Sequence, residues 1–155
     1  MKEARELVHG TSVTLGRRAV LLRGEPRSGK SDLALRFMAL PGEGELQPRL
    51  VADDQVWIEA SSDGALVVSA PETIAGKIEV RGLGIVTVPF LAKARLVLVC
   101  DLVQGKDVPR MPPHPWERTV IAGVPVPVLK LDPFELSAPL KLKMALLLAA
   151  PEQPV

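Results

Sequence analysis

The chain has 155 residues, 47% of them hydrophobic, and a formal net charge of +1 at pH 7. This length and apolar content predict a single domain over residues 1–155 and argue against global disorder. The near-zero charge, with two Trp, three Phe and no Tyr, argues against a nucleic-acid partner, and the charge also argues against binding to an anionic membrane.

The N-terminal residues and the cysteine content indicate a cytoplasmic protein. Residues 1–6 are charged and no apolar stretch follows them, so they do not form a signal peptide. No apolar run approaches the length of a membrane span. The single cysteine, Cys100, lies in an apolar run, so we expect a buried thiol and no disulfide within the chain.

Strand patterns dominate the first half of the chain. A helix is predicted over 31–40, because apolar residues recur four positions apart, as Leu33 and Phe37 do, and because Pro41 follows. Short apolar and β-branched runs predict strands at 13–15, 19–22, 50–52, 56–58 and 66–68. A turn at 61–64 makes the last two of these strands a hairpin.

The second half combines one strong strand with a proline-rich segment. The continuous apolar run 96–100 predicts a central strand buried on both faces. Residues 105–127 contain six prolines and are expected to form a surface loop or an edge strand. A last helix is predicted over 140–150, with a flexible tail at 151–155. The whole pattern predicts an α/β fold with a mixed, strand-rich sheet and few helices.

A phosphate-binding loop lies between the strand at 19–22 and the following helix. The segment 24–31 has the pattern G-x-x-x-x-G-K-S in the required strand–loop–helix context. Its backbone N–H groups and the helix N-terminus attract a phosphate, Lys30 is placed to reach the β and γ oxygens, and Ser31 is placed to ligate Mg²⁺. The predicted nucleotide-binding residues are Gly24, Glu25, Pro26, Arg27, Ser28, Gly29, Lys30 and Ser31.

Two positions compete for the carboxylate that phosphoryl transfer requires. Asp53 and Asp54 follow the strand at 50–52, and Asp101 follows the run 96–100. Adjacent residues on a strand point to opposite faces, so we expect only one of the first pair to face the phosphates. The spacing alone leaves the choice between Asp54 and Asp101 open.

A third feature is the segment Glu79-Val-Arg-Gly-Leu-Gly84. Glu79 and Arg81 are expected to share one face of an extended segment, and Gly82 and Gly84 allow a tight turn or a close approach to a ligand. The absence of asparagine from the sequence excludes the guanine-recognition motif of small G proteins.

Together these motifs resemble the catalytic domain of the HPr kinase/phosphorylase family, which phosphorylates a serine of the phosphocarrier protein HPr. The matching elements, in family order, are His9-Gly10, the loop 24–31, the strand end 50–54 and the segment 78–85. The resemblance covers residues 8 to about 147. It implies a P-loop fold of the phosphoenolpyruvate carboxykinase/HPr kinase type, ATP and Mg²⁺ as cofactors, and an HPr-like protein as the partner.

The resemblance also implies a role for individual residues. Lys30 binds the terminal phosphates, and Ser31 and Glu79 hold Mg²⁺. Asp54 is the base that takes the serine proton, and His9 is its partner. Arg110 takes the place of a downstream catalytic arginine, while Asp101 belongs to a structural strand. Asp53, Arg81, Gly82 and Gly84 complete the matching site residues.

The chain departs from the longer family members in three respects. It starts directly at the kinase domain, its segment 127–135 is different, and its C-terminal HPr-contacting and assembly helices are expected to be shortened. In this it resembles short alphaproteobacterial forms, and homo-oligomer formation is left open. Residues 127–135 replace a Lys-, Arg- and Gly-rich loop, and Asp132 and Glu135 would repel phosphate unless they face away, so we expect phosphorylase activity to be slow or absent. Two alternatives are a P-loop kinase for a small metabolite and an ATP-sensing domain without transfer activity.

Overall fold

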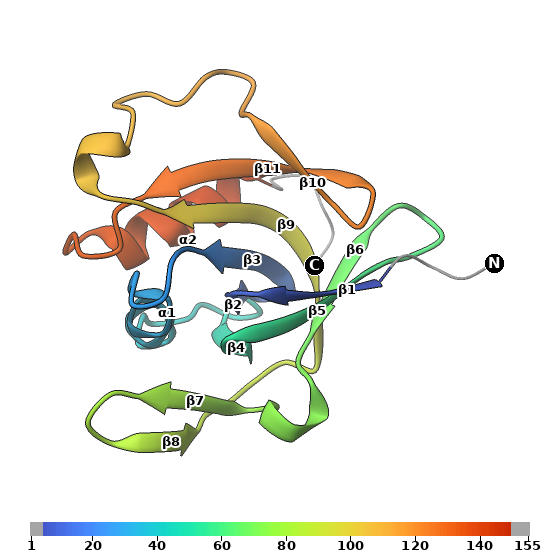
Figure 1. The fold of residues 1–155 in the computed structure, drawn as a ribbon, viewed down its shortest axis with the longest axis vertical. Helices are drawn as coiled ribbons and strands as arrows, with labels where there is room; N and C mark the ends of the chain where they lie inside the picture. The colour runs from blue at the N-terminus through green and yellow to red at the C-terminus, as the bar shows by residue number, and fades with distance from the viewer. Residues whose placement is uncertain (1–4, 150–155) are drawn as a thin grey trace.

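The computed structural model describes residues 5–149, and the tail predicted at 151–155 lies outside this range. Two α-helices, α1 (Lys30–Met38) and α2 (Ala138–Ala149), and the short 3-10 helices η1 (Glu72–Ile74) and η2 (Gly105–Asp107) accompany a set of strands (Figure 1). The strands are β1 (Arg5–His9), β2 (Thr11–Leu15), β3 (Arg18–Arg23), β4 (Pro48–Ala52), β5 (Gln55–Ala60), β6 (Leu66–Ser69), β7 (Lys77–Val80), β8 (Gly84–Thr87), β9 (Lys93–Leu102), β10 (Arg118–Ile121) and β11 (Val124–Leu131).

The main sheet is mixed and has β9 near its centre. Its strand order is β1-β5-β6-β9-β3-β2-β4, and β11 also pairs with β9. The pairs β3–β9 and β9–β11 are parallel, whereas the other pairs of this sheet are antiparallel. The hairpin β7–β8 forms a separate two-stranded sheet, which lies below the main sheet in Figure 1. The prediction of a mixed, strand-rich α/β fold is therefore confirmed.

The core lies on both faces of the sheet because its central strands are apolar on both sides. On one face Leu98 and Cys100 of β9 belong to a buried cluster that includes α1 and α2. On the other face Val99 belongs to a second cluster, formed with β5, β6 and the hairpin β10–β11. Burial raises the pKa of the Cys100 thiol to about 12, in agreement with the prediction of a buried cysteine.

Helix α1 follows the phosphate loop because its sequence has one apolar face. Leu33, Ala34 and Phe37 are buried, while Asp32 and Arg36 form an ion pair four residues apart on the opposite side. The helix ends at Met38, before the prolyl stop that the sequence predicts. Helix α2 packs against α1 and β9 through the same cluster and begins two residues before the predicted start.

The proline-rich segment is partly a hairpin and not only a loop. The half of β11 that contains Pro125 and Pro127 pairs with the edge strand β10. Its proline-free half, 128–131, pairs in parallel with β9. Proline has no N–H to donate to a ladder, so the half without proline is the one that joins the main sheet. The sequence predicted an edge strand here but not the strand at 128–131.

Candidate active site

The phosphate loop connects β3 to α1, as its sequence context predicts. Gly29 immediately precedes the helix and has a φ of 97°, which favours glycine. The Lys30 Nζ donates hydrogen bonds to the backbone oxygens of Gly24 and Glu25, at 2.9 and 3.1 Å. The ammonium group therefore lies within the loop, where it would meet the phosphates of a bound nucleotide.

Asp53 is the centre of the polar network beside this loop. The residue is 7% exposed, and its Oδ1 accepts hydrogen bonds from the hydroxyls of Ser31, at 2.7 Å, and Thr11, at 3.0 Å. Its Oδ2 accepts a hydrogen bond from the Glu79 backbone N–H at 3.2 Å. One carboxylate thus connects the start of α1, the start of β2 and the strand β7.

Asp54 differs from Asp53 in both conformation and exposure. It is exposed and has a φ of 74°, a left-handed conformation that interrupts the alternation of a regular strand. Its backbone oxygen accepts a hydrogen bond from the Gly10 N–H at 3.0 Å. His9, the last residue of β1, pairs with Gln55. The backbone therefore brings His9 and Asp54 next to each other.

Asp101, the competing carboxylate, is engaged in a different interaction. It pairs with Arg23 between the parallel strands β3 and β9, and its two oxygens accept hydrogen bonds from the guanidinium at 2.7 and 3.1 Å. The carboxylate that contacts Ser31 is Asp53 and not Asp101. The choice that spacing left open between Asp54 and Asp101 stays a prediction, since the loop hydroxyl contacts Asp53 and neither of those two.

The segment around Glu79 lies beside Asp53, but its side chains are not arranged as predicted. Glu79 is exposed in β7, and Arg81 lies beyond the end of this strand, in the turn to β8. Gly82 and Gly84 have φ values of 90° and 97°. The expectation that Glu79 and Arg81 share one face of an extended segment is therefore wrong, because the chain reverses directly after Val80.

Within residues 5–149, the Arg110 side chain forms no hydrogen bond or ion pair with the other site residues. It is exposed in the loop between η2 and β10, which runs along the upper edge of the molecule in Figure 1. The hairpin with Glu79 lies at the opposite edge. Its role as the downstream arginine stays a prediction.

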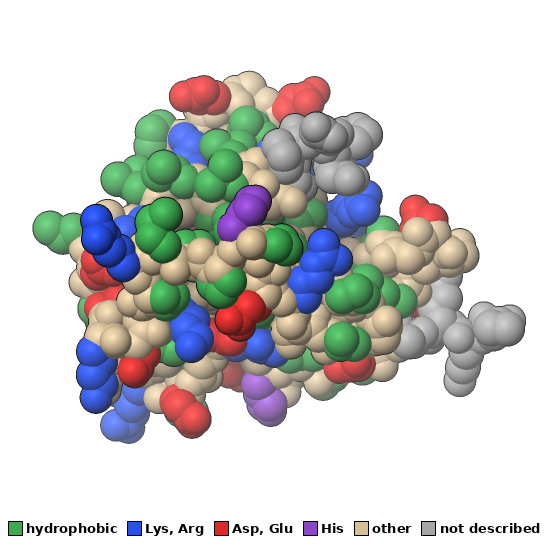
Figure 2. Space-filling model, turned by 90° about the horizontal axis from the view of Figure 1, so that it is seen from above, with side chains coloured by type: hydrophobic (Ala, Val, Ile, Leu, Met, Phe, Trp, Pro, Cys, Tyr) green, Lys and Arg blue, Asp and Glu red, His purple; other side chains and the backbone are tan. Residues whose placement is uncertain are grey.

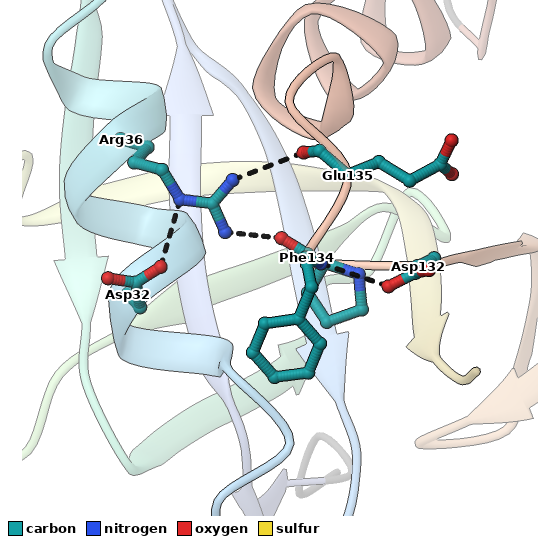
Figure 3. A network of polar contacts seen from close by, with 6 residues as sticks. Asp32, Arg36, Asp132, Phe134 and Glu135 are labelled. Atoms are coloured by element: carbon teal, nitrogen blue, oxygen red, sulfur yellow. Dashed lines mark hydrogen bonds and ion pairs between the residues drawn. The ribbon is translucent and has the colours of Figure 1, made fainter. Parts of the chain in front are cut away.

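Two features of the site have no counterpart in the sequence motifs. Thr11 supplies a hydroxyl to Asp53, and a threonine in an apolar strand has no signal that distinguishes it from a packing residue. Arg36 in α1 donates hydrogen bonds to the backbone oxygens of Pro133 and Glu135 (Figure 3). The segment 132–135 is thereby held against α1, although it is about 100 residues away in the sequence.

The donors at this site suit Mg²⁺ and the phosphates of a nucleotide. Mg²⁺ is usually bound through one or two carboxylates together with phosphate oxygens and water, rather than by a protein cage. The Ser31 hydroxyl and the Asp53 carboxylate are oxygen ligands in contact with each other, and the exposed Glu79 carboxylate belongs to the residue whose N–H contacts Asp53. Residues 5–149 contain no cluster of three or more His, Cys, Asp or Glu side chains that could hold a metal ion.

The fold and the site together define a P-loop protein whose loop is accompanied by a hydroxyl–carboxylate pair. Residues 2–108 match the family described as HPr Serine kinase C-terminal domain. This match covers more than half of the chain, and the chain belongs to that family.

The relatives agree with this assignment. The HPr kinase/phosphorylase of Caldicellulosiruptor bescii is 38% identical over 131 residues, which are 78% of this chain and 40% of that protein. The one of Azoarcus sp. is 35% identical over 134 residues, 80% of this chain and 41% of that protein. The chain thus spans about two fifths of the length of these relatives.

A solved structure confirms the fold. The HPr(Ser) kinase/phosphatase of Coxiella burnetii superposes with a TM-score of 0.73 at 22% identity, over 90% of this chain and 87% of that one.

Within residues 5–149, neither helix is both long and apolar enough to serve as a membrane span. On the face seen in Figure 2, cationic and anionic side chains are interspersed with hydrophobic ones.

The comparisons do not support the expectation of weak phosphorylase activity, since the relatives are named for both reactions. The structure also weakens one physical reason for that expectation. Glu135 forms an ion pair with Lys141 at 3.1 Å, and Asp132 accepts a hydrogen bond from the Phe134 N–H at 2.9 Å. Glu135 thus has a cationic partner in α2 and Asp132 a backbone donor, so the predicted repulsion of a phosphate ion is reduced.

Proposed function

We propose that this chain is the catalytic part of an ATP- and Mg²⁺-dependent kinase that phosphorylates a serine of an HPr-like phosphocarrier protein. The observation that carries the proposal is the 2.7 Å hydrogen bond between Ser31 and Asp53. A loop hydroxyl and a strand-end carboxylate are the groups that hold Mg²⁺ in P-loop phosphotransferases. The protein substrate follows from membership of the HPr Serine kinase family.

The charge of the transferred group is handled by the loop and its neighbours. Lys30 exchanges its bonds to two loop carbonyls for bonds to phosphate oxygens when a nucleotide enters. Ser31, Asp53 and Glu79 would hold Mg²⁺, which would neutralise part of the phosphate charge. Thr11 keeps the Asp53 carboxylate oriented through its hydroxyl.

Asp54 is the general base for the substrate serine. A base that acts on a protein substrate must be accessible to that protein, and Asp54 is exposed whereas Asp53 is buried. The left-handed backbone at Asp54 directs its side chain differently from that of its neighbour. His9, next to it across the β1–β5 ladder, is its partner in the site.

The Asp54→Asn substitution tests this role. An amide lacks the basic oxygen of a carboxylate, so we expect at least a hundredfold loss of serine phosphorylation with unchanged ATP binding, since general bases contribute about 10²–10⁴-fold. The rate is followed with HPr and labelled ATP, and ATP affinity is measured by calorimetry. Asp107→Asn, which changes an exposed carboxylate in η2, is the matched control. Full activity of the Asp54 variant would contradict the assignment.

The same incubation separates this function from its two alternatives. A phosphoserine on HPr supports the kinase, a labelled small molecule supports a metabolite kinase, and ATP binding without transfer supports a sensor domain. The reverse reaction is part of the proposal, because the relatives are named for it. It is measured as pyrophosphate release from phosphoserine-HPr in the presence of Mg²⁺ and inorganic phosphate.

Several finer expectations stay predictions. They are the kinship to phosphoenolpyruvate carboxykinase, the likeness to short alphaproteobacterial forms, homo-oligomer formation, a cytoplasmic location and the single-domain extent of 1–155.

A further inference from the structure

The segment 132–135, directly after β11, is fixed in position by several independent contacts. Arg36 donates hydrogen bonds to two of its backbone oxygens, and Asp132 accepts one from the Phe134 N–H. Glu135 is paired with Lys141 at the start of α2, and Pro133 is buried. The backbone around Phe134 is therefore held by α1, by α2 and by its own turn.

Phe134 nevertheless has an exposed side chain. The residue is 70% exposed, and its ring projects from the segment toward the N-terminal end of α1 (Figure 3). The ring lies against the phosphate loop itself, since a Cβ placed on Gly29 would be 3.3 Å from the Cε1 and Cζ atoms of Phe134. An aromatic face is thus presented beside the loop that binds phosphate.

The sheet places Phe134 on the side of the loop opposite to Asp53. Strand β3, which leads into the loop, lies between β2 and β9. Beyond β2 is β4, which ends at the aspartate pair, and on the other side β9 pairs with β11, which leads to Phe134. If the terminal phosphates of a nucleotide lie at Ser31 and Asp53, the other end of that nucleotide can extend along the loop toward β11.

From this arrangement we infer that Phe134 forms an apolar wall of the nucleotide site and stacks on the adenine base. The inference rests on the proposed function, because it needs ATP in the loop. Every nucleobase has a face that stacks on an aromatic ring. Because contacts to α1 and α2 already hold the segment, little conformational freedom is lost when the base binds.

The test compares ATP with tripolyphosphate, which has the phosphates but no base. Binding to the full chain is measured by calorimetry in the presence of Mg²⁺. Phe134→Ala is expected to raise the Kd for ATP about tenfold, in the range that stacking supplies, and to leave the Kd for tripolyphosphate unchanged. Phe134→Trp is expected to restore ATP affinity. Leu136→Ala, at a neighbouring position that is 99% exposed, is the matched control and should bind both ligands as the unmodified chain does.

The outcomes separate this inference from the proposed function. If the unmodified chain binds neither ligand, the proposed function fails, and the inference fails with it. If the chain binds both and Phe134→Ala has an unchanged Kd for ATP, only the inference is overturned, including the case in which the variant raises KM for HPr and the ring meets the protein partner. Phe134→Leu, which keeps an apolar side chain without a ring, provides the same test if the alanine variant does not fold.

Discussion

Asp53 and Asp101 both lie at or near the end of an apolar strand, yet their surroundings make them chemically different. Asp53 is 7% exposed and accepts hydrogen bonds from two hydroxyls and one backbone N–H, all of them neutral. Asp101 has a side chain that is 33% exposed and accepts hydrogen bonds from the Nε and Nη2 groups of Arg23. Within residues 5–149 the hydrogen-bond partners of the Asp53 carboxylate are uncharged, whereas Asp101 has a cationic partner in Arg23.

The interactions of a strand-end carboxylate therefore depend on its neighbours across the sheet. Arg23 is the last residue of the strand that leads into the phosphate loop, and it is in register with Asp101. The ion pair occupies both oxygens of Asp101 on the β9 side of β3. On the other side, β2 contributes the Thr11 hydroxyl, which orients Asp53 without neutralising it. Of these two carboxylates, Asp53 is therefore the one expected to serve as a metal ligand.

The largest expected effect comes from removing Lys30, the lysine of the phosphate loop. Lys30→Ala should reduce serine phosphorylation to below about 1% of the normal rate, since losing one such charge-stabilising group costs about 3 kcal/mol or more. The Nζ contacts only two loop oxygens, so the thermal midpoint should stay within a few degrees. Kinase rate and thermal unfolding are measured together, with Lys106→Ala in η2 as the control. Activity well above 1% would contradict the assignment of the loop.

Asp53→Asn is expected to have the next largest effect, because it changes the carboxylate that is proposed to hold Mg²⁺. The amide loses the charge needed for Mg²⁺, and its NH₂ group cannot accept the hydrogen bond from the Glu79 N–H if its oxygen faces Ser31. We expect about a hundredfold lower rate and a loss of about 1–3 kcal/mol in the free energy of unfolding. Steady-state kinetics and urea unfolding measure the two effects, and an unchanged rate would remove Asp53 from the metal site.

Glu79→Gln should have a smaller effect that is specific to the metal. If the Glu79 carboxylate is a metal ligand, the amide weakens Mg²⁺ binding more than ATP binding. We expect the Mg²⁺ concentration for half-maximal activity to rise several-fold with little change in KM for ATP. Glu72→Gln, an exposed position in η1, is the control. An unchanged Mg²⁺ titration would assign the Glu79 side chain no part in the site.

The smallest effect is expected for Asp101→Asn, on the other side of the comparison. The Arg23–Asp101 pair is about one third exposed on each side, so solvent screening limits its contribution to about 1 kcal/mol or less. We expect a kinase rate within about twofold of normal and a small decrease in stability that salt reduces. If this variant is folded and inactive while Asp53→Asn is active, the roles of the two aspartates are reversed.

Local patterns predicted the elements that depend on local chemistry. The loop at 24–31, the helix after it and the central strand at 96–100 were predicted, because glycine, helical spacing and continuous apolar runs act within a few residues. Strand β1 was not predicted, because four of its five residues are exposed and carry no alternating pattern. The pairing of 128–131 with β9 was missed for a related reason, since the prolines before it obscure the strand.

The arrangement of the site depends on contacts that are distant in the sequence. The carboxylate that meets Ser31 is 22 residues away from it, and Thr11 is 42 residues from Asp53. Either Asp54 or Asp101 satisfied the spacing rule, but neither contacts the loop hydroxyl. The position of Phe134 beside Gly29 depends on Arg36 and on the strand β11, so no pattern around residue 134 indicates it.

The three hydrogen bonds to Asp53 also bear on the order in which this protein folds. They join β2, α1 and the hairpin strand β7, and the intervening loops must close before any of them forms. None of the three is made within a single hairpin or helix. The polar centre of the site is therefore expected to form late in folding, and protection of the Glu79 amide from hydrogen exchange would mark molecules in which the hairpin β7–β8 has docked against the end of β4.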